Sequence, residues 1–373
     1  MKLVLLGLLV ASSALAAPIE LEPGGSVRVN CRQHPAKRVR ISCETPEPSV
    51  TPTATATPTP RPTVTATATP RPTATPATLP AMTDYVANFN DWGRRHCEAL
   101  KNGPPDDPKL AATYYDAAWV YFQAFDKFRD AYWLSCADAA LAVYRDWYVL
   151  PNGGNVPGYW NFPHGMAEDC IRRGVAASCD GVRLLASNAA FARDTTAENT
   201  ADPQYSREVA YAIHALLQAE RIGQPRRARL SRLVNDALTH VDSWFVTRSA
   251  PYVRPFMAGL TAHALIAYHS ATPDPRILPA LRILADGLFP ALWLPQDGSF
   301  SYTDRQTPSG GLEAAPDLNQ LIAPLYFFLG DKTGELRYYE AGGAIFAGGV
   351  AGAWLNNGKQ FNQSYRWGLS LLQ

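Results

Sequence analysis

Helical segments recur along residues 81–373 at a nearly constant interval. Apolar residues at positions i, i+3, i+4, i+7 and i+8, as in the run from Val209 to Leu217, predict amphipathic helices. Every second segment opens with aromatic and polar residues, and one residue in each opening serves as a marker. The steps between markers are 46, 46, 47, 63 and 45 residues, and the markers are Tyr115, Asn161, Arg207, Arg254, Asp317 and Asn362. A repeat of this length predicts helical hairpins and an all-α domain.

A hairpin repeat can stack into an open solenoid or close into a ring. Six markers correspond to six inner and six outer helices, an (α/α)6 toroid. The segment at about 84–101 lacks a partner in the repeat, and it can close the ring by pairing with the last segment, at about 361–372. The marked segments are small and apolar, as in AAWVYFQAF, whereas the intervening segments carry most of the charges. These features favour the toroid over the solenoid.

In this arrangement the chain resembles the six-hairpin (α/α)6-toroid superfamily, which includes secreted glycoside hydrolases and polysaccharide lyases. The resemblance covers nearly all of residues 81–373 and rests on architecture and composition. The stretch QDGSFSYTD (296–304), within the one long step of the repeat, is similar to the glycine–aromatic turns that follow outer helices in such proteins. The resemblance implies a binding site where the inner helices begin, and it identifies no single family.

The first 80 residues have a different character. Residues 1–16 combine Lys2, an apolar core and a small-residue cleavage site, which is typical of a signal peptide. We therefore expect a secreted or cell-surface protein. Residues 17–44 predict a small β-type piece tied by a disulfide, and the Thr/Pro-rich residues 45–80 predict an extended linker. No stretch is apolar for the roughly 20 residues that a transmembrane helix requires.

Six cysteines in an exported chain predict disulfide bonds rather than reactive thiols. Proximity along the sequence pairs Cys31 with Cys43, Cys97 with Cys136, and Cys170 with Cys179. No CxxC or HxxxH spacing supports a metal site, and we expect no metal and no cofactor. The balance of 34 Lys and Arg against 33 Asp and Glu argues against a nucleic-acid partner. Nothing in the sequence predicts the oligomeric state.

If the markers lie where inner helices begin, their neighbours converge on one end of the ring, its mouth. Aromatic rings offer apolar faces, and Asn, Asp and Arg offer hydrogen bonds, the mixture that a sugar requires. We therefore expect a carbohydrate ligand. The candidate binding residues are Tyr115, Trp119, Trp160, Asn161, His164, Arg207, Tyr252, Arg254, Asn319, Asn362, Arg366 and Trp367. The alternative is that they are helix caps and packing residues.

Hydrolysis of a glycosidic bond needs one protonated and one ionised carboxyl group beside the bond. We predict Glu208 as the general acid, because it follows Arg207 at the start of an apolar helix, where partial burial favours the protonated carboxyl. Asp116 or Asp317 is then the base that acts on water. The structural alternative is that Glu208 pairs with Arg207 or another arginine of the mouth.

Two other functions remain open. One is β-elimination on a uronate polymer, which needs a cation or amide near the sugar carboxylate and a His or Tyr to move the proton. The residues that can supply these roles are Asn161, His164, Arg207, Tyr252, Arg254 and Arg366. The other is an extracellular module that binds a glycan or a protein without catalysis. Two carboxyls that face each other across the mouth would favour hydrolysis. His and Tyr beside Arg and Asn, without facing carboxyls, would favour elimination. A filled mouth would favour binding without catalysis.

Overall fold

The computed structural model describes residues 81–369. The predicted signal peptide, N-terminal piece, linker and Cys31–Cys43 pair lie outside the described residues. Contacts divide the chain into Met1–Pro72 and Thr73–Gln373, and only the second unit contains described residues. In that part of the chain, none of the helices combines the length and apolar character that crossing a membrane requires.

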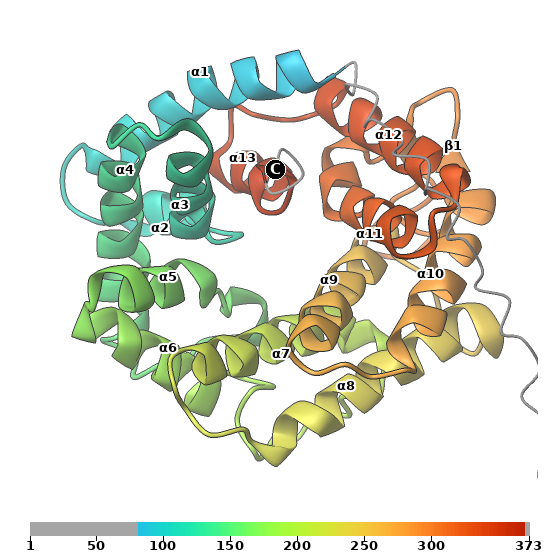
Figure 1. The fold of residues 1–373 in the computed structure, drawn as a ribbon, viewed down its shortest axis with the longest axis horizontal. Coiled ribbons are helices and arrows are strands. Elements are labelled where there is room, and N and C mark those ends of the chain that lie inside the picture. Colours follow the sequence, from blue (N-terminus) through green and yellow to red (C-terminus); the bar gives the residue numbers. More distant parts are fainter. Residues whose placement is uncertain (1–80, 370–373) are drawn as a thin grey trace, which may run out of the picture. The chain divides into compact units, whose positions relative to one another are not determined.

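The described residues are predominantly helical, and the helices form two alternating series (Figure 1). The outer series consists of α1 (Met82–Lys101), α4 (Tyr132–Leu141), α6 (Ala176–Asn188), α8 (Ala228–Val241), α10 (Ile277–Leu292) and α12 (Leu336–Ala351). The inner series consists of α3 (Ala117–Phe128), α5 (His164–Arg173), α7 (Ser206–Arg221), α9 (Pro255–Ala271), α11 (Ala323–Thr333) and α13 (Gly358–Tyr365). The all-α prediction is therefore confirmed.

Shorter elements connect the two series. They are α2 (Asp107–Ala112), the 3-10 helices η3 (Gly158–Trp160), η4 (Pro203–Tyr205) and η6 (Pro316–Leu321), and the π-helical continuations η2 (Ala142–Val149) and η5 (Asp242–Val246) of α4 and α8. Strands β1 (Trp293–Leu294) and β2 (Ser299–Phe300) form an antiparallel pair after α10. Gly298, with a φ of +57°, lies in their turn, so the QDGSFSYTD stretch is a turn that follows an outer helix.

Inner helices pack against one another in chain order. The packed pairs are α3 with α5, α5 with α7, α7 with α9, α9 with α11, η6 with α13, and α13 with α3. The first helix also packs against the last. The Tyr85 hydroxyl donates to the Ser364 carbonyl (2.9 Å), and the Tyr365 hydroxyl donates to the Tyr85 carbonyl (3.0 Å). The expected contact between first and last segments is present, although the last helix ends at Tyr365, before residue 372.

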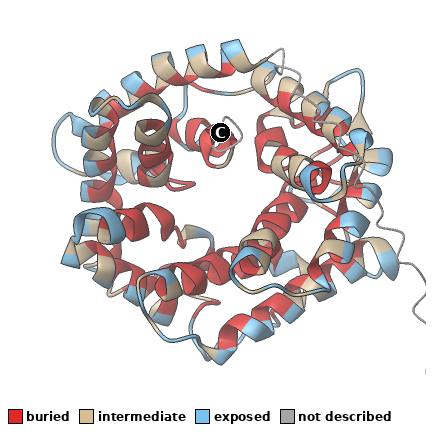
Figure 2. Ribbon diagram, viewed as in Figure 1, coloured by how far each residue is buried: buried red, intermediate tan, exposed pale blue. Residues whose placement is uncertain are grey.

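Burial differs between the two series, as Figure 2 shows. The outer helix α8 buries one face, which includes Leu230, Leu233 and Val234, and its charged residues lie mainly on the other. The inner helix α9 is buried over most of its length. Small residues permit this crowding: a Cβ atom at Gly259 would lie 2.3 Å from the Leu321 carbonyl oxygen, so α9 and η6 approach closely only because that position is glycine.

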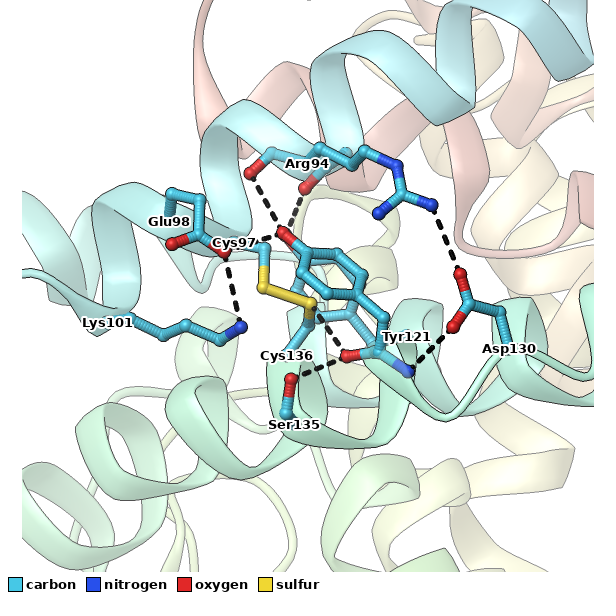
Figure 3. The surroundings of a disulfide bond; sticks show 10 residues. Arg94, Cys97, Glu98, Lys101, Tyr121, Asp130, Ser135 and Cys136 are labelled. Carbon is cyan, nitrogen blue, oxygen red and sulfur yellow. Dashed lines mark hydrogen bonds and ion pairs between the residues drawn. A yellow bond between two sulfur atoms is a disulfide. The ribbon is translucent and has the colours of Figure 1, made fainter.

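Two disulfides join neighbouring helices. Cys97–Cys136 links α1 to α4, and Cys170–Cys179 links α5 to α6, so both predicted pairings in the described residues are confirmed. The first is fully buried beneath a layer of charged side chains, including Glu98 (Figure 3). There Tyr132 donates a hydrogen bond of 2.7 Å to the Glu98 carboxylate. Cysteine spacing therefore predicted two of the covalent links between helices.

Candidate functional site

Five of the six sequence markers lie where inner helices begin. Arg207 is the second residue of α7, Arg254 is the N-cap of α9, and Asp317 lies in η6 directly before α11. Tyr115 and Asn161 precede α3 and α5 by two and three residues. Asn362 differs, because it lies in the middle of α13. The repeat therefore located the starts of the inner helices in all but the last hairpin.

Seven residues lie at or near the Tyr114 ring and the start of α7, and we call them the mouth cluster. They are Tyr114, Tyr159, Trp160, Arg207, Glu208, Asp317 and Lys359. The rings of Tyr114 and Trp160 meet edge to face at 4.8 Å, and Lys359 Nζ lies 4.9 Å from the centre of the Tyr114 ring. The Arg207 guanidinium lies 5.5 Å from the centre of the exposed Tyr159 ring. The cluster thus combines aromatic faces with charges of both signs.

Glu208, the predicted general acid, is buried at the start of α7 and paired with its neighbour. Its Oε1 accepts hydrogen bonds from Arg207 Nη2 (2.5 Å) and Nε (3.1 Å). Its Oε2 is buried and has no hydrogen-bond partner among the described residues. The pairing that the sequence raised as the structural alternative is therefore present, and one carboxylate oxygen is left for another role.

Asp116 holds α3 and α5 together. It is the N-cap of α3 in a left-handed conformation (φ 69°), and its carboxylate accepts from the backbone N–H groups of Trp119 (3.3 Å), His164 (2.9 Å) and Gly165 (3.1 Å). Burial raises the pKa of Asp116 to about 6, although the Arg366 charge and these hydrogen bonds oppose the rise. Because both carboxylate oxygens are occupied, the geometry supports a structural role for Asp116 over action on water.

Asp317 is the other predicted base. It lies in η6, and burial raises its pKa. Gln363 Nε2 donates to its carboxylate (3.2 Å) and to its backbone carbonyl (2.7 Å), which fixes the side chain against α13. The charge of Asp317 acts on Lys359, so this carboxyl belongs to the mouth cluster.

A second group, which we call the buried layer, is centred on Arg366, just after α13. The guanidinium carbon of Arg366 lies 5.2 Å from the ring centre of Phe162, 5.0 Å from that of Tyr211 and 5.1 Å from that of Trp367. Arg366 is fully buried, and its charge and a hydrogen bond to the Tyr211 hydroxyl oppose the rise that burial causes in the pKa of Tyr211. The Asn161 amide is also buried, and neither its oxygen nor its nitrogen has a hydrogen-bond partner among the described residues.

Three histidines from successive inner helices complete the buried layer. The rings of His164 and His214 lie 4.8 Å apart, and the His263 ring stacks on Trp367 at 4.6 Å. Burial, assisted by the Arg366 charge, holds the pKa values of His164 and His214 well below the usual range and lowers that of His263 to about 3. The three rings are therefore neutral at neutral pH. No group of three or more His, Cys, Asp or Glu among residues 81–369 is arranged to hold a metal ion.

Two predicted ligand residues are engaged by the backbone. Asn319 Nδ2 donates to the carbonyls of Gly298 (2.9 Å) and Ile345 (3.1 Å). Asn362 Nδ2 donates to those of Ala112 (2.7 Å) and Tyr114 (2.9 Å). These bonds satisfy carbonyl groups between helices, which supports the structural alternative for both asparagines.

Tyr252 and Arg254 lie apart from these two groups, beside the insertion at 294–316. The Arg254 guanidinium lies over the rings of Tyr252 (4.7 Å) and Tyr302 (5.7 Å) and donates to Ser309. Trp119 contributes to the fold, because its indole nitrogen donates to the Arg366 carbonyl (3.1 Å). Pockets of about 390, 530 and 640 Å³ lie along the outer helices and the insertion. None of the predicted site residues lines them, although Val253, which stands between Tyr252 and Arg254 in the sequence, lines the last.

Sequence reasoning did not choose several members of both groups, namely Tyr114, Tyr159, Phe162, Tyr211 and Lys359. Tyr114 and Tyr159 are sequence neighbours of the predicted residues Tyr115 and Trp160. Tyr211 and His214 lie one and two helical turns beyond Arg207, on a face of α7 where core residues are expected. Lys359 follows the N-cap Asn357 by two residues, and a helix-start signal at that point would have drawn attention to it.

The chain matches no protein-family model, no curated protein and no solved structure. The geometry of the mouth cluster and the buried layer therefore carries the functional argument by itself.

Proposed function

We propose that residues 81–373 form a closed (α/α)6 toroid of the six-hairpin type, and that this domain acts on a carbohydrate outside the cell. The contacts from α3 through α13 and back to α3 support closure, as does the packing of α1 on α13. Two disulfides suit an oxidising compartment, which supports export.

One observation carries the carbohydrate proposal: aromatic faces and polar atoms without protein partners gather at the starts of the inner helices. The Asn161 amide and Glu208 Oε2 both lack hydrogen-bond partners among the described residues. Buried polar groups are normally hydrogen-bonded, so such a concentration indicates a place built for another molecule. A sugar, with apolar ring faces and a rim of hydroxyls, fits this mixture of surfaces.

Glycoside hydrolysis is the first proposed chemistry. Glu208 offers a buried carboxylate oxygen without a partner, and Asp317 offers a second carboxyl whose pKa is raised by burial. Because Asp116 is occupied by three backbone N–H groups, we now assign the base to Asp317. In this proposal the protonated form of Glu208 gives its proton to the leaving oxygen, and the ionised form of Asp317 takes a proton from the attacking water.

A specific observation favours β-elimination as the second candidate. A neutral histidine can accept a proton, and His164 is held neutral while its Nδ1 has no hydrogen-bond partner among the described residues. Tyr211 belongs to the same buried layer, where Arg366 supplies positive charge, and the buried Asn161 amide precedes Phe162 of that layer in the sequence. This combination is the one that abstraction of a proton beside a sugar carboxylate requires.

A panel of neutral and acidic polysaccharides tests the proposal. New reducing ends without ultraviolet absorbance indicate hydrolysis, and reducing ends together with the absorbance of unsaturated sugars indicate elimination. Glu208→Gln should abolish hydrolysis and spare elimination, whereas His164→Gln should do the reverse. Neither signal, with no saccharide bound in calorimetry, would refute the proposed function; binding without cleavage would leave a glycan-binding module and refute both chemistries.

A further inference from the structure

Lys359 is a cation of the mouth cluster that forms no close ion pair. It lies in the first turn of α13, where the Asn357 side chain accepts a hydrogen bond from its backbone N–H (2.9 Å). Its Nζ lies over the Tyr114 ring, and no carboxylate of the described residues lies within 4.0 Å of it. Lys101 and Lys109, by contrast, each have a carboxylate within that distance. The position of Lys359 is therefore not explained by an ion pair.

A second cation lies close enough to Lys359 to disfavour its charge. Burial lowers the pKa of Lys359, the positive charge of Arg207 lowers it further, and only Asp317 acts in the opposite direction. The two like charges repel, and an anionic group beside Lys359 would reduce that cost. Arg207 already donates to Glu208 through Nη2 and Nε, so Lys359 is the cation that an anionic group would meet without a close carboxylate.

Each of the two cations lies beside an aromatic ring. The Tyr114 ring lies beneath Lys359 and against Trp160, and the Tyr159 ring lies beside Arg207. The charge of the buried Arg366 also acts on Tyr114 from below. An aromatic face suits the apolar face of a sugar ring, and a cation beside that face suits an acidic substituent on the sugar.

We propose that the mouth cluster selects saccharides that carry an acidic group, and that Lys359 and Arg207 bind its anionic oxygens above Tyr114. This inference rests on the proposed carbohydrate function and names the class of ligand. The shared chemistry is a carboxylate or sulfate on a sugar. Lys359 is a binding and specificity residue in this scheme, whichever of the two cleavage reactions takes place.

The test measures binding to the full chain by calorimetry at low and high salt. The ligands are oligosaccharides of matched length with carboxylates, with sulfates or with no charge. Lys359→Gln should weaken binding of at least one acidic class by roughly tenfold, the scale of one charge-assisted hydrogen bond, and leave neutral binding unchanged. Lys359→Arg should retain most of the affinity. Lys332→Gln is the matched control, because Lys332 also lies over an aromatic ring (Phe328, 5.5 Å) on α11.

The outcomes separate this inference from the function on which it rests. The inference is supported if Lys359→Gln binds acidic oligosaccharides more weakly, Lys332→Gln does not, and Lys359→Gln keeps the thermal unfolding midpoint of wild type. The ligand class whose binding is weakened then identifies the acidic group as carboxylate or sulfate. Equal binding of neutral and acidic ligands by wild type overturns it and leaves the carbohydrate function standing. Equal losses in Lys359→Gln and Lys332→Gln also overturn it. No binding of any saccharide overturns both.

Discussion

The disulfide between Cys97 and Cys136 should contribute more stability than the one between Cys170 and Cys179. A disulfide stabilises a fold mainly by restricting the unfolded chain, and the effect grows with the length of the closed loop. The sequence separations are 39 and 9 residues. The loop-entropy relation then gives about 3.9 kcal/mol for the first disulfide and about 2.6 kcal/mol for the second at room temperature.

Burial acts in the same direction. Cys97 and Cys136 are fully buried, whereas Cys170 and Cys179 are only half-buried, so replacing the first pair by alanine also removes more packing. We therefore expect Cys97→Ala/Cys136→Ala to lower the free energy of unfolding by at least about 1 kcal/mol more than Cys170→Ala/Cys179→Ala.

Urea unfolding of the two double variants and wild type measures this difference. Tryptophan fluorescence and circular dichroism should report the same midpoint for each protein, which justifies a two-state fit. The denaturant slope should rise in both variants, because an unfolded chain without the cross-link exposes more surface. An equal or larger loss in the Cys170→Ala/Cys179→Ala variant would refute the argument from loop length.

Three further predictions follow from single positions. Gly259→Ala should lower the free energy of unfolding by about 1–3 kcal/mol in urea, because the new Cβ would meet the Leu321 carbonyl at 2.3 Å; unchanged stability would contradict the close approach of α9 and η6. Asn362→Ala should lower it by about 1–3 kcal/mol, because two buried carbonyls lose their donor, and a loss of saccharide affinity at unchanged stability would instead restore the ligand role predicted from sequence. Between about pH 6 and pH 4 the folded Asp116 (pKa about 6) binds a proton, whereas the unfolded carboxyl (pKa 3.8) does not. The contribution of Asp116 to the free energy of unfolding should therefore rise by up to about 3 kcal/mol as the pH falls through this range, and should be lost as the pH rises again toward 6. Urea unfolding across this range should show that gain in wild type and not in Asp116→Asn, and parallel pH profiles would disprove it.

The helical repeat could be predicted because it is a local property of the sequence. The spacing of apolar residues identified the helices, and the positions of Arg207, Arg254 and Asp317 at helix starts followed from it. The pairings of the four cysteines in the described residues followed from their spacing. The last hairpin was placed less well, because α13 is short and Asn362 lies inside it.

The site was harder to predict because side-chain roles depend on contacts between distant segments. Tyr115 and Asp116 both adopt positive φ angles (67° and 69°), and this local turn decides which of the neighbouring tyrosines meets Trp160. No pattern of residue types reveals such a turn where no glycine is present. Likewise, an asparagine that satisfies backbone carbonyls, such as Asn362, cannot be told from one that binds a ligand until its partners are known.

The contact between the first and last helices imposes an order on folding. Tyr85 bonds to Ser364 and Tyr365, residues that follow it by about 280 positions, so α1 cannot complete its packing until α13 has been synthesised. During that interval the aromatic side chains of α1, including Phe89, lack the neighbours on α13 that later cover them. A chain released before α13 would keep this aromatic strip uncovered, which is the kind of surface that chaperones retain and that drives aggregation. Synthesis of α13 is therefore the step that allows α1 to complete its packing.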